Sequence, residues 1–276
     1  MAQLLGAARK PAGPVLELPQ VTFVLPATSL DGAHLAKYRA VCGFTPQQGV
    51  PLIYPQLLTF PLMMQFMASR YCPWPAMGTV HLSNRIEQRE ALHPGDVLRV
   101  EMTTGGLFAH DKGQVYTLEL RILRADKPVW QATQGLLRVG VKAPAGKAWA
   151  SSPGGDAALS RQADFEAPAD IGRRYGRVSG DLNPIHLSAI SARPLGFKRA
   201  IAHGMWTKAR ALAALLPQRP VAAATVAVEF KTPLLLPATA SLWVARQQRD
   251  TQFEVRDSMG QKPHLRGQLH IGDSSP

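Results

Sequence analysis

The order of predicted elements is the same in the two halves of the sequence. An apolar helix candidate at residues 54–68, interrupted by Pro61, precedes four strand-like runs in the first half, and an amphipathic candidate at 203–216 precedes four in the second. The runs are 78–88, 92–104, 114–124 and 128–139, then 224–230, 234–246, 251–257 and 264–272. This repeated order predicts an α+β fold in which each half wraps an antiparallel sheet around a helix.

A stretch rich in Ala, Gly, Ser and Pro lies between the halves. Residues 141–160, VKAPAGKAWASSPGGDAALS, have no sustained apolar period and are typical of a linker. We therefore expect an N-terminal unit at 1–140 and a C-terminal unit at 161–276. Pairing the two units into one continuous sheet would cover faces that each would otherwise expose.

The composition favours a packed cytoplasmic protein. Of 276 residues, 46% are hydrophobic and 18% are charged, which predicts a sizeable core. No apolar run approaches the ~18 residues of a membrane span, and the first basic residues follow the short N-terminal apolar run, the wrong order for a secretory signal. Cys42 and Cys72 are too few for a disulfide framework.

The formal charge of +12 raises the question of nucleic-acid binding. The basic excess is spread over both halves without a run of five or six bases, and no zinc-finger spacing or RNA-binding aromatic signature accompanies it. A diffuse basic field suits any anionic partner, including a small molecule that bears phosphate. We therefore expect an anionic ligand and no nucleic acid.

The stretch YGRVSGDLNPIHLSA at residues 175–189 carries the strongest chemical pattern. Asn183 is a preferred helix N-cap and Pro184 fits the first helical position, so His186 falls in the first turn and Asp181 in the loop before it. The positive helix end favours an ionised Asp181 and a neutral His186, which together can hold and polarise one water molecule. The alternative is that the polar groups only cap the helix and the imidazole only packs.

This stretch resembles the hydratase 2 motif of MaoC-like (R)-specific enoyl-thioester hydratases and dehydratases. The match covers Tyr175, Ser179, Gly180, Asp181, Asn183, Pro184, Ile185, His186 and Ala189, within a wider similarity over roughly 165–272. The resemblance implies a double hot-dog fold, with two units that each wrap an antiparallel sheet around a long helix.

The resemblance also implies an activity and a site. The reaction would be hydration of trans-2-enoyl thioesters of CoA or acyl-carrier protein, or dehydration of (R)-3-hydroxyacyl thioesters, with Asp181 and His186 holding the water. Gly204, in AIAHGMW at a predicted helix start, would offer its N–H to the thioester carbonyl. Substrate-binding roles are expected for Asn183, Ser179, His203, Lys198 and Arg199. Of these, Lys198 and Arg199, together with Lys231, would contact phosphate groups; the alternative is that they are ordinary surface bases. The chemistry needs no metal or redox cofactor.

The first half departs from the motif and is not expected to catalyse. The position equivalent to His186 falls near Tyr38, where Asp31 and His34 occur without an Asn-Pro pair. The apolar side chains of 54–68 either line an acyl-chain pocket, as adaptable Met residues can, or form ordinary core. The candidates are Met63, Met64, Phe66 and Met67.

Two other functions use the same fold. A thioesterase would direct a carboxylate at the thioester carbonyl, and an acyl-thioester-binding or assembly subunit would not turn over; the intact Asp-x-Asn-Pro-x-His and His-Gly patterns argue against both. The sequence leaves open the acyl chain length, the carrier, the physiological direction and whether the chain forms a homodimer.

Overall fold

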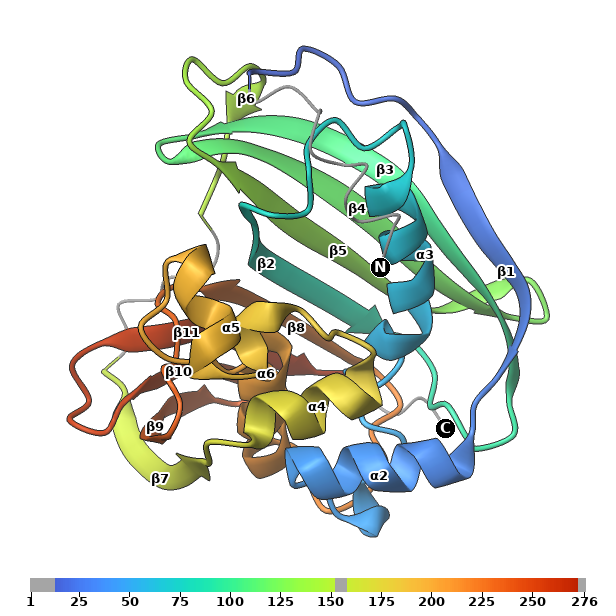
Figure 1. Ribbon diagram of the computed structural model, residues 1–276. Helices are drawn as coiled ribbons and strands as arrows, with labels where there is room; N and C mark the ends of the chain where they lie inside the picture. The colour runs from blue at the N-terminus through green and yellow to red at the C-terminus, as the bar shows by residue number, and fades with distance from the viewer. Residues whose placement is uncertain (1–12, 152–157, 273–276) are drawn as a thin grey trace.

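The two halves of the chain share one mainly antiparallel sheet. A computed structural model describes residues 13–151 and 158–272. The strands follow the order β1-β3-β4-β5-β2-β8-β11-β10-β9-β7, with β6 beside β3 outside this path (Figure 1). At the centre, β2 from the first half pairs with β8 from the second, so that Ser83 lies opposite Glu229 and Gln88 opposite Ala224. The predicted continuous sheet is therefore confirmed.

In its described residues the first half supplies one end of this sheet and two α-helices. Its elements are β1 (Thr22–Ser29), α2 (Gly32–Cys42), the 3-10 helix η2 (Pro46–Gln48), α3 (Gln56–Ala68), β2 (Thr79–Gln88), β3 (Val97–His110), β4 (Gly113–Arg124), β5 (Lys127–Val139) and β6 (Lys147–Ala148).

The second half repeats the plan with more helical turns before its central helix. Its elements are β7 (Ser160–Ala167), α4 (Ile171–Ser179), η3 (Pro184–His186), α5 (Ala189–Ala192), η4 (Arg193–Leu195), α6 (Gly204–Leu215), β8 (Ala224–Phe230), β9 (Ala238–Gln247), β10 (Asp250–Asp257) and β11 (Pro263–Ile271).

All eight strand-like runs of the sequence are strands, and the helices predicted at 54–68 and 203–216 form, as α3 and α6. The sequence reading did not single out β1, α2, β7 or α4. The range 141–160 contains β6 and the first residue of β7, and residues 152–157 within it lie outside the described residues. The proposed unit boundaries remain a prediction.

In each half a helix packs on the sheet through aromatic contacts. Phe66 of α3 meets Phe23 of β1 edge-on at 6.4 Å between ring centroids, and α3 continues through Pro61. Trp206 of α6 meets Phe165 of β7 at 5.9 Å. Such pairs add specificity to the apolar burial that holds helix and sheet together. Within the described residues, no helix combines the length and the apolar character needed to cross a membrane.

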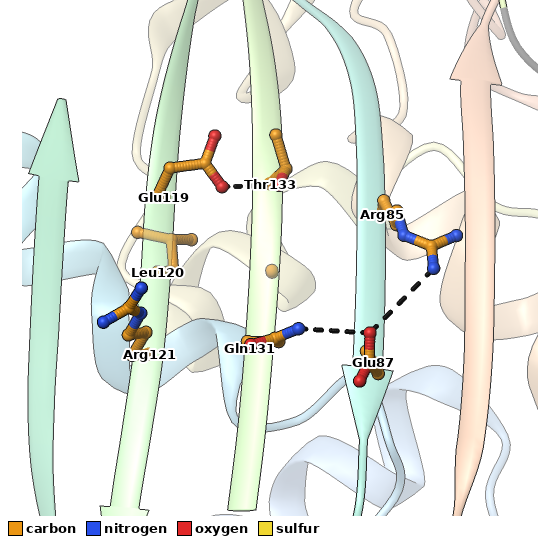
Figure 2. A pocket seen from close by; sticks show the side chains of 8 residues that line it. Arg85, Glu87, Glu119, Leu120, Arg121, Gln131 and Thr133 are labelled. Atoms are coloured by element: carbon orange, nitrogen blue, oxygen red, sulfur yellow. Dashed lines mark hydrogen bonds and ion pairs between the residues drawn. The ribbon is translucent and has the colours of Figure 1, made fainter. Parts of the chain in front are cut away.

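The opposite face of the first half's sheet is polar, and several of its side chains interact with one another. On β4, β5 and β2 they line a shallow pocket of about 270 Å³ (Figure 2). Glu119 accepts a hydrogen bond from Thr133 Oγ1 at 2.6 Å. Glu87 accepts one from Gln131 Nε2 at 3.1 Å and lies 3.9 Å from Arg85 Nη2. This face is therefore a polar outer surface.

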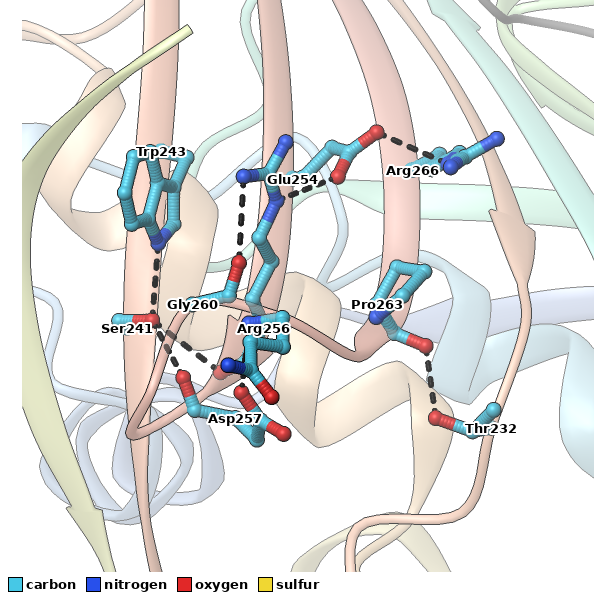
Figure 3. Close-up of polar contacts among 10 residues, drawn as sticks. Thr232, Ser241, Trp243, Glu254, Arg256, Asp257, Gly260, Pro263 and Arg266 are labelled. Carbon is cyan, nitrogen blue, oxygen red and sulfur yellow. Dashed lines mark hydrogen bonds and ion pairs between the residues drawn. The ribbon is translucent and has the colours of Figure 1, made fainter.

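In the second half, too, buried and outward-facing side chains alternate along a strand. On β10, Phe253 and Val255 are buried, whereas Glu254 and Arg256 project to the other side. Glu254 accepts from Arg256 Nε at 2.7 Å and pairs with Arg266 Nε at 2.8 Å (Figure 3). Because successive strand residues point to opposite faces, one apolar face meets the helices and one polar face remains outside.

A chain of buried polar side chains crosses the joint between the halves. Lys208 of α6 is fully buried, and within the described residues both of its hydrogen-bond acceptors belong to Asn84 of β2, with Oδ1 at 2.5 Å. Asn84 Nδ2 donates to Gln56 Oε1 at 3.1 Å, and Gln56 Nε2 donates to Gln134 Oε1 at 3.2 Å. Burial holds the pKa of Lys208 well below its usual value. The chain links α6 to β2, α3 and β5.

We predict that Asn84→Ala destabilises the protein more than Lys208→Met does. The first change removes the side-chain acceptor at 2.5 Å and leaves the buried amine only the backbone oxygen of residue 84 at 3.3 Å, at a cost of about 2 kcal/mol, whereas the second removes the group that needs an acceptor. Urea unfolding of both variants measures the difference. The double variant should be more stable than Asn84→Ala alone. Equal losses of stability in the two single variants, or a loss in the double variant equal to their sum, would contradict this account.

Candidate active site

The segment between α4 and α5 positions Asp181 and His186, the two residues of the motif with a proposed acid–base role. Gly180, in the left-handed conformation at φ 79°, ends α4. Asn183 then caps η3 by accepting a hydrogen bond from Ile185 N at 3.3 Å. Asp181 precedes this turn and His186 closes it. The predicted helix start is thus a 3-10 turn of three residues, and the next α-helix begins only at Ala189.

Three hydrogen bonds tie this segment to the residues just before α6. Ile201 N donates to Ile185 O at 3.0 Å. His186 Nδ1 donates to Ile201 O at 2.8 Å, and His203 Nε2 donates to Asp181 O at 3.0 Å. A carbonyl oxygen can only accept, so these bonds assign the ring protons when each imidazole is neutral. His186 then carries its proton on Nδ1 and has its lone pair on Nε2.

The imidazoles and the carboxylate form one compact cluster. The rings of His186 and His203 stack with centroids 3.6 Å apart and planes 25° apart. Tyr175 of α4 lies 4.9 Å from the His203 ring, and Asp181 Oδ2 lies 3.7 Å from His203 Nε2. The His203 side chain is 3% exposed, whereas that of Asp181 is 35% exposed. Solvent or a ligand therefore reaches the carboxylate more easily than the His203 imidazole.

Both histidines are held neutral near pH 7. Burial lowers the pKa of His186, and the Asp181 charge and the hydrogen bond to Ile201 oppose that change only in part. Burial lowers the pKa of His203 further, helped by the charge that His186 would carry. Two stacked imidazoles cannot both be protonated at low cost. The cluster therefore presents one carboxylate and a neutral imidazole base.

The N-terminus of α6 adjoins this cluster. The helix begins at Gly204, directly after His203, so its first backbone N–H groups have no partner within the helix. Phe230 of β8 lies on this glycine: a Cβ placed there would be 2.7 Å from the Phe230 ring. A side chain at position 204 would therefore meet the Phe230 ring, and the helix end can offer N–H donors to an oxygen beside His203.

Two glycines on α4 let the segment 181–186 lie against the helix. A Cβ at Gly172 would be 1.9 Å from His186 O, and one at Gly176 would be 2.8 Å from Asp181 O. The two residues are one turn apart and share a helix face. We did not single them out from the sequence, although their spacing, Gly-x-x-x-Gly in IGRRYG, is a visible signal of close backbone approach.

The remaining predicted site residues have different roles. Ser179 Oγ accepts from Asp181 N at 3.2 Å and so shapes the loop. Lys198 is exposed in an open hollow of about 430 Å³ lined also by Arg193, Gly196 and Phe197. Arg199 Nη1 donates to Pro237 O at 3.4 Å. Lys231 forms an ion pair with the buried Glu229.

The first half contains a counterpart of the turn without its chemistry. Helix α2 also ends in a left-handed glycine, Gly43, and the 3-10 turn that follows has a proline at its first position. By order of elements Gln48, not a residue near Tyr38, is the counterpart of His186; the expected position was displaced into the middle of α2. Gln48 Nε2 donates to Ala213 O and Leu216 O at the end of α6. Thr45 takes the place of Asn183.

The apolar side chains of α3 are largely core. Met63 and Phe66 are 5% and 0% exposed, whereas Met64 and Met67 are half-buried. The core alternative therefore holds for the first pair. A role in lining an acyl pocket remains a prediction.

The cluster also has the residue types of a metal site. Asp181, His186 and His203 each offer one possible ligand atom, and these three atoms lie within 4.8 Å of one another. Nearly parallel stacked rings, however, direct their in-plane lone pairs side by side and not toward one point. One ring would have to rotate and break its backbone hydrogen bond before both could bind the same ion.

Comparisons with known proteins identify the family and the fold. The sequence model described as "MaoC like domain" matches residues 152–266. A protein of Mycobacterium tuberculosis, 3-hydroxyacyl-thioester dehydratase X, is 34% identical over 256 residues, which cover 90% of this chain and 89% of the relative. The crystal structure of HtdX from Mycobacterium tuberculosis matches with a TM-score of 0.77 at 30% identity, over 91% of this chain and 100% of that one.

The fold has a described counterpart as well. A further Mycobacterium tuberculosis protein, described as having a double hotdog fold, matches with a TM-score of 0.56 at 14% identity, over 94% of this chain and 98% of that one. The architecture is a double hot-dog of the α+β class, as the motif implied. The chain belongs to the MaoC-like dehydratase family.

We predict that Gly172→Ala destabilises the protein, although alanine normally favours a helix interior by about 0.5–1 kcal/mol. The new methyl group meets a backbone carbonyl that cannot rotate away, and overpacking of this kind costs about 1–3 kcal/mol. Gly176→Ala, with a longer contact, is the matched control and should cost less. Urea unfolding gives both values; a stabilised Gly172→Ala variant would mean that the segment does not lie against α4.

We predict that stability falls as the pH is lowered from 7.5 to 5.5. Below the ordinary histidine pKa of 6.5 the unfolded chain takes up protons that the buried rings of His186 and His203 resist. Each ring that stays neutral costs about 1.4 kcal/mol of stability at the lower pH. Urea unfolding at the two pH values should show this loss, and His203→Phe should reduce it. Equal stability at both pH values would contradict the assignment of neutral rings.

Proposed function

We propose that this protein catalyses the hydration of trans-2-enoyl thioesters to (R)-3-hydroxyacyl thioesters and the reverse dehydration. Membership of the MaoC-like dehydratase family supports the reaction class, as does the name of its 34% identical relative, 3-hydroxyacyl-thioester dehydratase X. The (R) configuration and the residue roles below belong to the proposal. A cytoplasmic location and assembly into a homodimer remain open parts of it.

One observation carries the proposal: the hydrogen bond from His186 Nδ1 to Ile201 O. It leaves the Nε2 lone pair of a neutral imidazole available beside the ionisable carboxylate of Asp181. A water molecule between the two groups can donate one O–H to each. An imidazole in the other tautomer would present a donor and could not act as the base.

Hydration then proceeds with both groups acting on that water. Its oxygen forms a bond to C3 while the pair Asp181 and His186 accepts one of its protons. The C2–C3 π electrons shift toward the thioester, and a proton returned by the pair forms the new C2–H bond. Dehydration reverses these steps: the pair removes the C2 proton, and the C3–O bond breaks as the hydroxyl is protonated and leaves as water.

The backbone N–H of Gly204 stabilises the negative charge that develops on the thioester oxygen. The thioester oxygen becomes enolate-like in the transition state, and the first N–H groups of α6 begin beside His203, next to the Asp181–His186 pair. A preorganised donor of this kind is worth about 3 kcal/mol. His203 holds Asp181 by its carbonyl and supports the His186 ring, which places both groups relative to this helix end.

The thioester carrier, CoA or acyl-carrier protein, supplies the anionic groups. Lys198 and Arg193 line the exposed hollow that follows α5. Solvent-exposed bases attract phosphate groups and raise the rate of encounter. Arg199 and Lys231 are less suited, because the first donates to Pro237 O and the second pairs with Glu229.

We predict that Asp181→Asn and His186→Ala each lower kcat by about 100-fold or more, the range for loss of a general acid–base group. The assay follows the loss of enoyl absorbance with trans-2-enoyl-CoA of short and medium chain length, and chiral analysis of the product tests the configuration. His93→Ala, an exposed histidine outside the cluster, is the control and should keep wild-type rates. Full activity in either cluster variant, or an (S) product, would refute the corresponding part of the proposal.

A further inference from the structure

A third histidine, His81 of β2, lies beside the active site but comes from the other half of the chain. Its ring is 4.8 Å from the ring of Phe230, and Phe230 in turn lies on Gly204. The Asp181 carboxylate and the Lys208 amine both influence the pKa of His81. His81 is therefore a neighbour of the helix end proposed to bind the thioester oxygen.

The backbone of β2 is built irregularly at this point. The register of β2 against β5 shifts between His81 and Ser83, which marks a β-bulge. The pairing of β2 with β8 begins on the far side of this shift, at Ser83 opposite Glu229. Bulges re-aim side chains and are frequent beside active sites. His81 thus lies just beyond the end of the ladder that joins the two halves.

One ring nitrogen of His81 has no partner among the described residues. Its Nε2 is shielded from solvent and forms no hydrogen bond there, although the residue as a whole is partly exposed. Burial lowers the pKa of the His81 ring to about 3, so the ring is neutral at pH 7. In the tautomer that carries its proton on Nδ1, the neutral ring has a free lone pair at Nε2, an acceptor that is costly to leave unpaired.

The substrate class limits what can pair with this acceptor. An enoyl thioester has no N–H or O–H group on its acyl side, and the single O–H of a 3-hydroxyacyl thioester lies at C3, where the Asp181–His186 pair is proposed to act. The thiol arm shared by CoA and carrier proteins has an amide N–H two methylenes from the sulfur, close to the carbonyl that Gly204 would bind. This amide is the donor nearest to the thioester in either carrier.

We propose that His81 Nε2 accepts a hydrogen bond from this amide N–H and so makes the first half of the chain a specificity-determining part of the site. The inference rests on the proposed thioester function. It assigns the non-catalytic half a direct contact with the thiol arm, separate from the contacts of the acyl chain.

A matched pair of substrates tests this contact. Crotonyl-S-(N-acetylcysteamine) has the amide N–H, and the crotonyl thioester of 2-mercaptoethyl acetate replaces only that N–H with oxygen. Wild type should favour the amide by about 10-fold in kcat/KM, the effect of an unpaired buried acceptor. His81→Phe should treat both substrates alike, and His81→Gln, which retains an acceptor, should recover part of the preference.

Binding separates this inference from the proposed reaction. The saturated butyryl thioesters of the same two thiols cannot be hydrated, and calorimetry measures their affinities directly. A wild-type preference for the amide that His81→Phe abolishes supports the contact even if no enoyl thioester turns over, an outcome that would refute only the proposed reaction. An equal preference in wild type and His81→Phe, or none in wild type, overturns the role of His81.

Discussion

The hydrogen bond between His186 Nδ1 and Ile201 O is the interaction on which the site depends. It fixes the ring proton, and with it the position of the lone pair, while the backbone bond from Ile201 N to Ile185 O keeps the two segments in register. His203 completes the arrangement by donating to Asp181 O. A carboxylate, a neutral imidazole and a helix N-terminus are thereby held together by backbone atoms, which side-chain motion cannot easily disturb.

The two halves share a plan and divide the work. Each has a helix ended by a left-handed glycine, a 3-10 turn with proline at its first position, and a central helix on the sheet. In the first half Gln48 occupies the place of His186 and hydrogen-bonds the end of α6, which is a structural role. The continuous β2–β8 pairing and the buried contact between Lys208 and Asn84 keep the halves in fixed positions. The first half has no counterpart of the Asp181–His186 pair among its described residues, but its strand β2 can still contribute a side chain to the site.

Much of the fold was predictable because its signals are local. Alternating strands such as 224–230 and the apolar helix at 54–68 carry their periodicity in adjacent residues, and both form as expected. The place of Asp181 and His186 also follows from local capping by Asn183 and Pro184. The stacking of His186 on His203 depends instead on how α6 docks, and the neighbourhood of His81 depends on a bulge and on pairing between halves. Neither leaves a periodic trace in the sequence.

The direct test of this account is the tautomeric state of the histidines, read from nitrogen-15 NMR of protein labelled on its imidazole rings. At pH 7.5 the account predicts two neutral rings in the cluster, with the proton on Nδ1 in His186 and on Nε2 in His203, assigned with His186→Ala and His203→Phe. A His186 ring that is charged, or that carries its proton on Nε2, would contradict the arrangement on which the proposed catalysis rests.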